Sequence, residues 1–454
     1  DVATIDADIT NTTPMIIGKA PWYVLNENHF NGSIDEIRIW NDVRTESEIK
    51  SNMYKELAGN EANLVAYYNM SNGSGSTLDD NQTAGTNDGT ISGAEWKASG
   101  AFAETKYALN FDGIDDYVHC GNGAEVQFNG TQNFTVEAWV KPTAAQWGSV
   151  VSKFQHDAAH EGYSLEMFSD YRVAFFLGNN WSDWEPLNST QALTPNTWHH
   201  IAATYDGSTM RIYIDGRLDG SAPWTNGVTD SGTPLVIGAR MGTTVFGTFF
   251  AGSIDEVRVW NSARTEFQLR ENICKTRVGN EANLKAYYRL DENDGNTAYD
   301  YSSSGYNGTL TDNPFWVSSD AFNTWIGAES ASWSNSGNWS KGVPTSEQSV
   351  GLYRWSLGED AKISSDPTVR NLLISSTTSP MLNSNLTVNR NLILHYDLDL
   401  NGYDITLGST SYLLEGTGVL SGTAGTISTT RNLTNLSSVN VALLGAQITT
   451  AANM

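Results

Sequence analysis

Residues 252–261 read GSIDEVRVWN, a short stretch in which apolar side chains recur between polar ones. Two further stretches of this kind are FTVEAWV at 134–140 and RIYI at 211–214. Such alternation is typical of strands that bury one face, because successive side chains point to opposite sides of a sheet. Asp-Gly pairs at 206–207 and 215–216 tolerate the positive φ of tight turns. The pattern predicts an all-β fold, an antiparallel jelly-roll sandwich.

This stretch has a near-identical copy 220 residues earlier, where residues 32–41 read GSIDEIRIWN. The hexapeptide GNEANL likewise stands at both 59–64 and 279–284. Only the second copy is preceded by a full set of strand patterns. We therefore expect residues 1–100 to be the C-terminal part of a first jelly roll and residues 101–320 to be a complete one. The incomplete first copy predicts that the chain is an excerpt from a longer polypeptide.

Four blocks of the second copy, taken in order, resemble those of concanavalin A-like, laminin-G-like jelly-roll domains. They are YALNFDGIDDYV at 107–118, FTVEAWV at 134–140, NTWHHIAATYDG at 196–207 and GSIDEVRVW at 252–260. The resemblance implies a two-sheet jelly roll that usually binds glycans or proteins, often with structural Ca²⁺.

Residues 321–454 differ in composition, being rich in Ser, Thr, Asn, Leu and Gly. Short apolar segments recur at even spacing, at 369–374, 386–388, 392–394, 398–400 and 405–407, with asparagines expected in the turns between them. Each segment is too short to bury a face alone, but stacked parallel rungs would share one core. We expect a β-solenoid-like segment that is truncated. It resembles the β-solenoid openings of bacterial secreted surface proteins, including large Bacteroidota adhesins exported by type IX secretion.

The charge balance restricts the partners of the chain. Among 454 residues, 51 are acidic and 26 basic, a formal net charge of −25. Such a surface repels nucleic acid and anionic membranes, and it suits an extracellular, cell-surface protein. No apolar run is long enough to span a membrane, which predicts no membrane insertion. The two cysteines, Cys120 and Cys274, could form one bridge or remain as two buried thiols.

One helix is predicted after the strand that ends at Trp260, because Thr265 and Gln268 form a capping-box pattern. The first copy repeats this pattern with Thr45 and Glu48.

Carboxylates near a glycine turn are candidate calcium ligands. Asp112, Asp115 and Asp116 surround Gly113, and Asp255 lies on the last strand of the sandwich, which can lie beside the first strand. Calcium prefers several oxygen ligands close together. We therefore predict a structural calcium site at these four residues. The alternative is that Asp112 only shapes the turn, while Asp255 bonds backbone amides or pairs with Arg258.

Four tryptophans in polar, loop-like contexts are candidate glycan ligands: Trp147, Trp181, Trp184 and Trp224. A flat indole can stack on a sugar ring while neighbouring polar groups bond its hydroxyls. The alternative is that Trp184 and Trp224 belong to strands or to the core.

No catalytic residues are predicted. The closely spaced acidic triplet of jelly-roll glucanases is absent, and no nucleophile elbow occurs. His156 and His160 are interpreted as solvated loop residues, and His199 and His200 as structural. The favoured function is a cell-surface adhesin segment that binds glycans or surface polymers. Other parts of a larger polypeptide, or a secretion machinery, are further possible partners. The alternatives are an accessory region of a secreted carbohydrate-active enzyme or protease, and a pure spacer.

Overall fold

The computed structural model describes residues 107–325 almost continuously and residues 14–96 and 332–450 with gaps. Its contacts divide the chain into two compact units. One unit comprises residues 1–45 and 56–101, and the other comprises residues 46–55 and 102–454. Strands are the main regular element in the described residues of both units, in agreement with the predicted all-β class.

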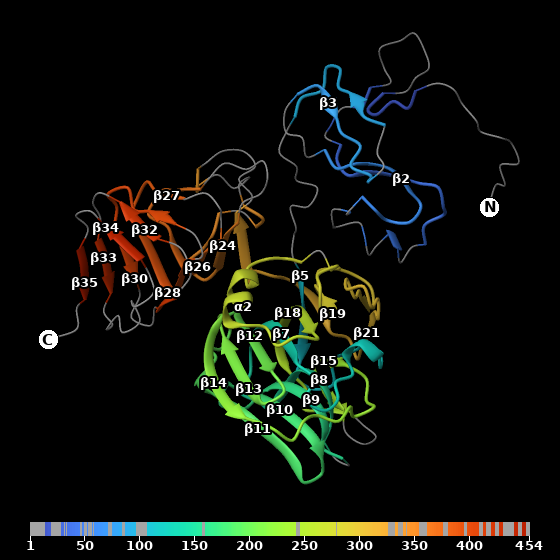
Figure 1. Ribbon diagram of the computed structural model, residues 1–454, viewed down its shortest axis with the longest axis vertical. Helices are drawn as coiled ribbons and strands as arrows, with labels where there is room; N and C mark the ends of the chain where they lie inside the picture. Colours follow the sequence, from blue (N-terminus) through green and yellow to red (C-terminus); the bar gives the residue numbers. More distant parts are fainter. Residues whose placement is uncertain are drawn as a thin grey trace, which may run out of the picture. The chain divides into compact units, whose positions relative to one another are not determined.

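Two antiparallel sheets form the jelly roll of the second unit (Figure 1). The first, which we call the β10 sheet, has the order β11 (Asp183–Ala192), β10 (Arg172–Asn180), β9 (Glu161–Met167), β8 (Gly148–Gln155), β15 (Val236–Ile237), β6 (Tyr117–His119), β21 (Gly308–Thr311) and β20 (Thr297–Ala298). The second, the β7 sheet, has the order β14 (Arg217–Pro223), β13 (Thr209–Ile214), β12 (His199–Tyr205), β7 (Phe134–Pro142), β18 (Ala251–Trp260), β5 (Tyr107–Asp112) and β22 (Phe315–Ser318), and β19 (Leu284–Tyr288) also pairs with β18. A short hairpin, β16 (Arg240–Met241) with β17 (Phe246–Gly247), and a 3-10 turn, η1 (Ala124–Val126), complete this part.

The core of the jelly roll lies between these sheets. Phe134 of β7 is at its centre, with ring centroids 5.0 Å from Tyr163, 6.1 Å from Phe175 and 5.9 Å from Tyr205. Tyr163 and Phe175 come from the β10 sheet, whereas Tyr205 comes from the β7 sheet. Inward side chains of both sheets therefore meet in one apolar cluster, whose burial is the main stabilising contribution.

Strand β18 departs from the simple alternation that its sequence predicts. Ile254, Val257 and Val259 are all fully buried in the core, although the first two are three residues apart. Glu256 adopts φ +52°, and the pairing of β18 with β7 shifts between Asp255 and Arg258. This β-bulge changes the phase of the strand, so that apolar residues on both sides of it point inward.

The sequence repeat extends to side-chain hydrogen bonds. In the second copy, Arg258 pairs with Glu256 at 2.5 Å, and the hydroxyl of Tyr287 donates to Glu256 at 2.8 Å. In the first copy, Arg38 pairs with Glu36 at 2.6 Å, and the hydroxyl of Tyr67 donates to Glu36 at 2.9 Å. The first unit contains β1 (Ile37–Trp40) paired with β2 (Leu64–Tyr68), and β3 (Thr77–Leu78) paired with β4 (Gly89–Thr90).

The predicted capping box is present at helix α2 (Glu266–Asn272). The backbone amide of Gln268 donates to the side chain of Thr265, and the Gln268 side chain accepts the backbone amide of Thr265. The helix expected after Thr45 lies largely outside the described residues.

All paired strands of the C-terminal region are parallel, within its described residues, as predicted for the part beyond about residue 365. One sheet has the order β23 (Phe322–Trp325), β24 (Ser349–Tyr353), β26 (Thr368–Ser375), β28 (Leu386–Leu394), β30 (Ile405–Leu407), β33 (Thr426–Thr429) and β35 (Gln447–Thr450), with β31 (Tyr412–Leu414) also beside β28. The other has the order β25 (Lys362–Ile363), β27 (Met381–Leu382), β29 (Leu398–Asp399), β32 (Val419–Gly422) and β34 (Asn440–Leu443). Buried Leu, Ile and Val side chains, together with three tryptophans, form a core of the C-terminal region that is separate from the jelly-roll core.

The turns expected at Asn389 and Asn391 are wrong, because strand β28 runs continuously through them. Asn391 is buried and lies in register with Asn371 of β26, whose side-chain oxygen accepts its backbone amide at 3.0 Å. Asn371 in turn donates to Ser349 of β24 at 2.9 Å. A ladder of polar side chains thus stacks along the sheet, which gives Asn371 and the backbone amide of Asn391 hydrogen-bond partners without a turn.

Among the residues that the structure describes, no helix is both long and apolar enough to cross a membrane.

Candidate functional site: an aromatic face on the jelly roll

Three of the four predicted tryptophans gather on the outer face of the β10 sheet. With Phe176 and His160 they form a chain of ring contacts, Trp147–Phe176–Trp184–His160–Trp181, which we call the aromatic row. The ring centroids are 6.4, 6.1, 4.5 and 4.3 Å apart in that order. The angles between successive ring planes are 19°, 14°, 31° and 20°. The five rings therefore present roughly similar orientations along one face.

The two ends of the aromatic row are exposed and its middle is not. Trp181 is 61% exposed and Trp147 is 42% exposed, whereas Phe176 and His160 are buried and Trp184 is half-buried. Exposed indoles cost hydrophobic free energy and are depleted from ordinary protein surfaces. Two of them on one sheet face mark this face as the candidate binding site.

Local structure fixes Trp181 at the tip of the hairpin between β10 and β11. The side-chain oxygen of Asn180 accepts the backbone amides of Ser182 and Asp183 at 2.9 and 3.2 Å. His160 stacks on the Trp181 ring from below. It can approach because β10 has a glycine there: a Cβ at Gly178 would lie 2.0 Å from the carbonyl oxygen of His160.

A buried charge pair supports Trp147 at the other end. The carboxylate of Glu166 is fully buried and accepts the indole N–H of Trp147 at 2.5 Å. It also accepts the hydroxyl of Ser164 at 2.7 Å and pairs with Arg240 at 3.0 Å. The Arg240 guanidinium lies 5.0 Å from the Trp147 ring centroid, within the range of a cation–π contact.

Two sequence interpretations of this region are wrong. Trp224 is 6% exposed and belongs to the jelly-roll core, where its indole donates to the carbonyl of Gly227 at 2.7 Å, so it cannot meet a ligand. His160 is not a solvated loop residue, because two indoles enclose its ring.

Phe176, Glu166 and Arg240 were missed by sequence reasoning. The signal for Phe176 was present: Val173, Phe175 and Leu177 point into the core, so a strand places Phe176 on the opposite face. Glu166 and Arg240 are 74 residues apart, and nothing in their local sequence pairs them.

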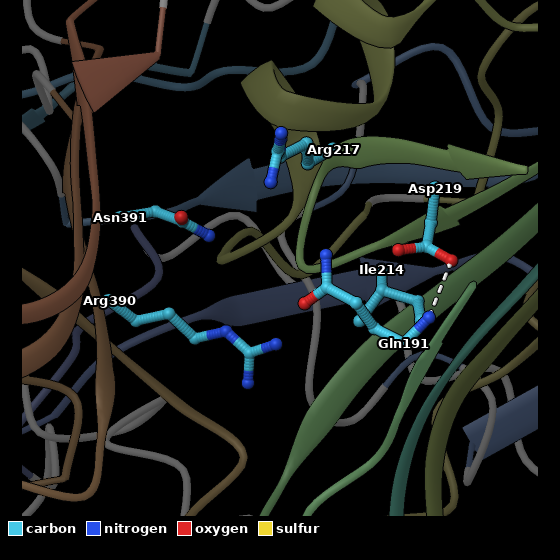
Figure 2. Close-up of a pocket in the computed structure, with 6 residues that line it drawn as sticks. All are labelled: Gln191, Ile214, Arg217, Asp219, Arg390 and Asn391. Atoms are coloured by element: carbon cyan, nitrogen blue, oxygen red, sulfur yellow. Dashed lines mark hydrogen bonds between the residues drawn. The ribbon is translucent and has the colours of Figure 1, made fainter. Parts of the chain in front are cut away.

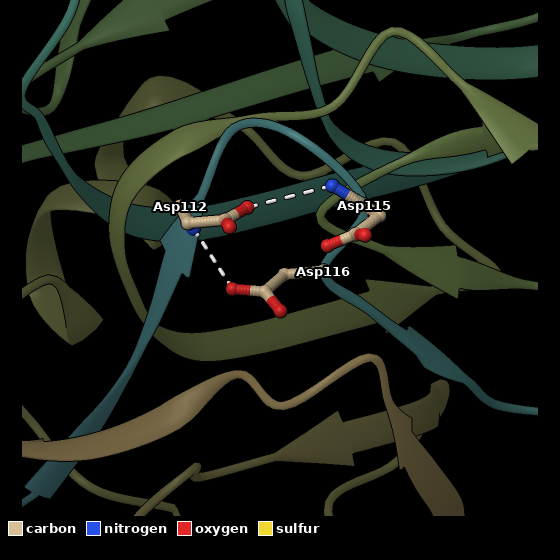
Figure 3. Close-up of side chains that lie close together, drawn as sticks. All are labelled: Asp112, Asp115 and Asp116. Carbon is tan, nitrogen blue, oxygen red and sulfur yellow. Dashed lines mark hydrogen bonds between the residues drawn. The ribbon is translucent and has the colours of Figure 1, made fainter.

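The predicted calcium ligands come together in part. Ligand atoms of Asp112, Asp115 and Asp116 lie within 4.8 Å of one another in the turn between β5 and β6 (Figure 3). Asp112 accepts the backbone amide of Ile114 at 2.7 Å, and Asp116 accepts that of Asp112 at 2.9 Å. Burial raises the pKa of Asp116, and the neighbouring charges of Asp112 and Asp115 add to the shift.

Asp255 does not join this group. In the register of β18 with β5, Ala251 faces Asp112 and Ile254 faces Leu109, so Asp255 lies farther along the strand. Four residues of strand correspond to roughly 13 Å. Asp255 is buried and accepts the hydroxyl of Ser319 at 2.5 Å. Arg258, on the other side of the bulge, forms an ion pair with Glu256.

A second polar cluster lies where the jelly roll meets the parallel strands of the same unit. Buried Asp215 accepts from His199 at 3.0 Å and pairs with Arg390 at 3.2 Å. Burial would raise the pKa of Asp215, but the charges of Arg390 and Arg370 and the contact with His199 outweigh it and lower the pKa. Burial lowers the pKa of His199 to about 4, against the attraction of Asp215. His199 is therefore neutral at pH 7.

A polar hollow adjoins this cluster (Figure 2). It is lined by Gln191, Ile214, Arg217, Asp219, Arg390 and Asn391. The carboxylate of Asp219 accepts the backbone amide of Gln191 at 3.1 Å, and Arg390 forms an ion pair with Asp215. Arg390 thus serves the contact between the two parts and Asp219 bonds strand β11, which makes the hollow a weaker candidate than the aromatic row.

The predicted structural roles of the adjacent histidines agree with their surroundings. His200 is buried and contacts Glu137 at 3.1 Å, and Glu137 also accepts the indole N–H of Trp260 at 2.7 Å. Burial would raise the pKa of Glu137, but the bond from His200 and the charge of Arg258 lower it. Both cysteines are buried free thiols, and burial raises the pKa of Cys120 to about 12.

Residues 2–50 and 112–270 match the family model described as the concanavalin A-like lectin/glucanases superfamily. Over residues 112–270 the jelly roll therefore matches the model of a concanavalin A-like, laminin-G-like domain. The matched residues make up less than half of the chain, and they include part of the first sequence copy as well as most of the second.

The solved structures to which the chain is similar match it at low sequence identity and low TM-score. A protein of Bacteroides ovatus, named as a candidate carbohydrate-binding protein, is 23% identical over 52% of this chain and 67% of its own, with a TM-score of 0.39. The SAP-like pentraxin of Limulus polyphemus is 15% identical over 48% and 97%, with a TM-score of 0.35. The CBM40 of the IT-sialidase of Ruminococcus gnavus is 13% identical over 37% and 97%, with a TM-score of 0.30.

Among curated proteins, mouse pappalysin-1 is 29% identical over 84 residues. These residues are 18% of this chain, and the chain spans only 5% of the length of pappalysin-1.

Proposed function

We propose that this chain is a segment of an extracellular, cell-surface adhesin, and that its laminin-G-like domain binds glycans through the aromatic row. The observation that carries the proposal is the pair of exposed indoles, Trp147 and Trp181, held at the ends of strands on one face of the β10 sheet. The hydrogen bond of Trp147 to Glu166 and the stacking of Trp181 on His160 hold the indoles in position, so little conformational entropy is lost when a sugar ring stacks on them.

The remaining chain supports a presenting role. The parallel strands after Phe322 have the pairing expected of a β-solenoid, which we propose as a stalk. Trp139 and Trp198 of the jelly roll pack with Phe322, Leu373 and Ile393 in one apolar cluster. A stalk held in this way would carry the binding domain without a flexible linker. Other partners, such as the secretion machinery of a bacterium or further parts of a larger polypeptide, belong to the same proposal.

We also propose Ca²⁺ at the turn of Asp112, Asp115 and Asp116. The three carboxylates fit a hard cation in their oxygen chemistry and spacing. Two of their oxygens already accept backbone amides, so the turn is formed by the chain and the ion would neutralise the remaining charge. Asp255 has no part in this site.

The experiment that tests the glycan proposal is binding of the 454-residue chain to an immobilised glycan array, compared with the variant Trp181→Ala. Loss of the indole should abolish most binding, while the variant melts at the same temperature because Trp181 is mostly exposed. Phe315→Ala is the matched control, since Phe315 is 52% exposed but lies on β22, outside the aromatic row. Unchanged binding of Trp181→Ala, or equal loss in the control, would contradict the proposal.

A further inference from the structure

We infer that the aromatic row holds two separate stacking subsites, one at Trp147 and one at Trp181, and that together they bind a linear, uncharged glycan chain. This inference rests on the proposed glycan-binding function and adds the ligand class and the manner of binding to it.

Strand register places the two indoles at opposite ends of β10. Gly148, the neighbour of Trp147, pairs with Met167 of β9, which pairs with Val173 at the beginning of β10. Trp181 directly follows Asn180, the last residue of β10. At about 3.3 Å per residue, the two positions are on the order of 20 Å apart along the strand. A single sugar ring cannot contact both indoles, whereas an extended chain can.

Rings without charge connect the two ends. Phe176 and His160 are 2% and 6% exposed, and half-buried Trp184 lies between them. The two buried rings support the indoles from within, so a ligand would meet the indoles and not Phe176 or His160. A chain stacked on the indoles would keep its hydroxyls towards water and its apolar ring faces towards the protein.

The charges around the aromatic row disfavour an anionic ligand. Among the described residues, the cation that contacts rings of the aromatic row is Arg240, which lies over Trp147 and Phe176. Its side chain is 7% exposed and pairs with Glu166. Its charge is therefore already neutralised and shielded from solvent. With a net charge of −25 over the chain, a carboxylated or sulfated glycan would be repelled.

Two subsites on one ligand imply a strong dependence on chain length. When one part of a chain is stacked on the first indole, the second stacking event becomes intramolecular, and linked binding of this kind raises affinity by 10²–10⁴. A ligand that reaches both Trp147 and Trp181 should therefore bind roughly a hundredfold more tightly than one that reaches a single indole.

The test is calorimetric titration of the 454-residue chain with cello-, xylo- and manno-oligosaccharides, from the disaccharide to the hexasaccharide. Affinity for at least one series should rise roughly a hundredfold with length. Trp147→Ala and Trp181→Ala should each reduce hexasaccharide affinity to the level of short ligands and leave disaccharide affinity within a few-fold. Phe315→Ala should bind like the wild type. If Trp147→Ala fails to fold, Trp181→Ala and the wild-type length series remain decisive.

The outcomes separate this inference from the proposed function. Binding that does not depend on length, or survives both substitutions, overturns the two-subsite inference and leaves glycan binding standing. Tighter binding of oligogalacturonides, an anionic series titrated in parallel, overturns the uncharged ligand class alone. No binding by any of the four series, together with a glycan array without signal, removes the proposed function itself.

Discussion

Single residues at the aromatic row combine exposure with firm support. Trp147 projects to solvent, but its N–H donates to a carboxylate that never meets water. Glu166 remains acceptable in that position because Trp147, Ser164 and Arg240 together satisfy it. The position and exposure of the Trp147 indole thus depend on the buried pair of Glu166 and Arg240.

Removal of Arg240 should destabilise the jelly roll strongly. Arg240→Ala leaves the Glu166 carboxylate buried without its counter-charge, and breaking such a pair costs about 3–5 kcal/mol in the free energy of unfolding. Urea unfolding followed by circular dichroism measures the change. The matched control is Arg172→Ala, because Arg172 pairs with Asp170 at the surface, where loss costs about 0–1 kcal/mol. If Arg240→Ala changes the free energy of unfolding as little as the control does, the Glu166–Arg240 pair does not support the jelly roll.

The His199 site should make stability depend on pH. Burial lowers the pKa of His199 to about 4, compared with 6.5 for the unperturbed side chain. Between these values the unfolded chain binds a proton and the folded chain does not, so stability falls as pH decreases from about 6.5 to 4. The loss contributed by this residue reaches up to about 3 kcal/mol. The pKa of Asp215 is lowered as well, so this carboxylate also costs stability in acid. That loss begins only when the pH falls below the ordinary pKa of a carboxyl group.

Urea unfolding at pH 7 and pH 5 measures this dependence. His199→Asn should lower stability at pH 7 and flatten the difference between the two pH values. An unchanged difference in the variant would assign the pH dependence to other groups.

At the scale of elements, periodicity and turn chemistry predicted most strands of the jelly roll and helix α2. They failed where one residue changes the geometry. The positive φ of Glu256 moves the phase of β18 by one residue, and no local pattern marks it. Asn391 resembles a turn residue, yet the ladder with Asn371 keeps it inside β28. Both exceptions depend on neighbouring strands, which a single sequence does not reveal.

The same limit applies to the candidate sites. The turn after β5 brings Asp112, Asp115 and Asp116 together because they are close in sequence. The inclusion of Asp255 in the calcium site depended on strand register, and that prediction was wrong. The aromatic row was predicted in part, because exposed tryptophans in polar loops are visible in sequence. Its two buried members, Phe176 and His160, come from separate segments, and only the fold shows that they belong to the row.

The β5–β6 turn should respond to calcium if it binds the ion. Removal of Ca²⁺ by a chelator is then expected to lower the melting temperature of the jelly roll, since an ion at 100 times its dissociation constant stabilises the fold by about 2.7 kcal/mol. Differential scanning calorimetry in millimolar calcium and in excess chelator gives the comparison. Asp116→Ala alone is not decisive, because it also removes the acceptor for the Asp112 amide. Identical melting curves, with no calcium found by elemental analysis, would reject the site.

At the scale of the whole molecule, the second unit joins the jelly roll to a stack of parallel strands. The apolar cluster of Trp139, Phe322 and Ile393 and the charged cluster of Asp215 and Arg390 hold these parts together. The aromatic row lies on the β10 sheet, whereas these contacts involve the β7 sheet, so the proposed ligand face and the contact with the parallel strands use different sheets of one sandwich.

The central claim is that glycans bind on the aromatic row. Its most direct test is a crystal structure of the chain with a neutral hexasaccharide from the series that binds most tightly. We predict sugar rings stacked on Trp181 and on Trp147, with one continuous chain between them along the outer face of β10. A hexasaccharide bound elsewhere, at the Asp112–Asp116 turn or at the hollow beside Arg390, with both indoles free of sugar, would contradict the account.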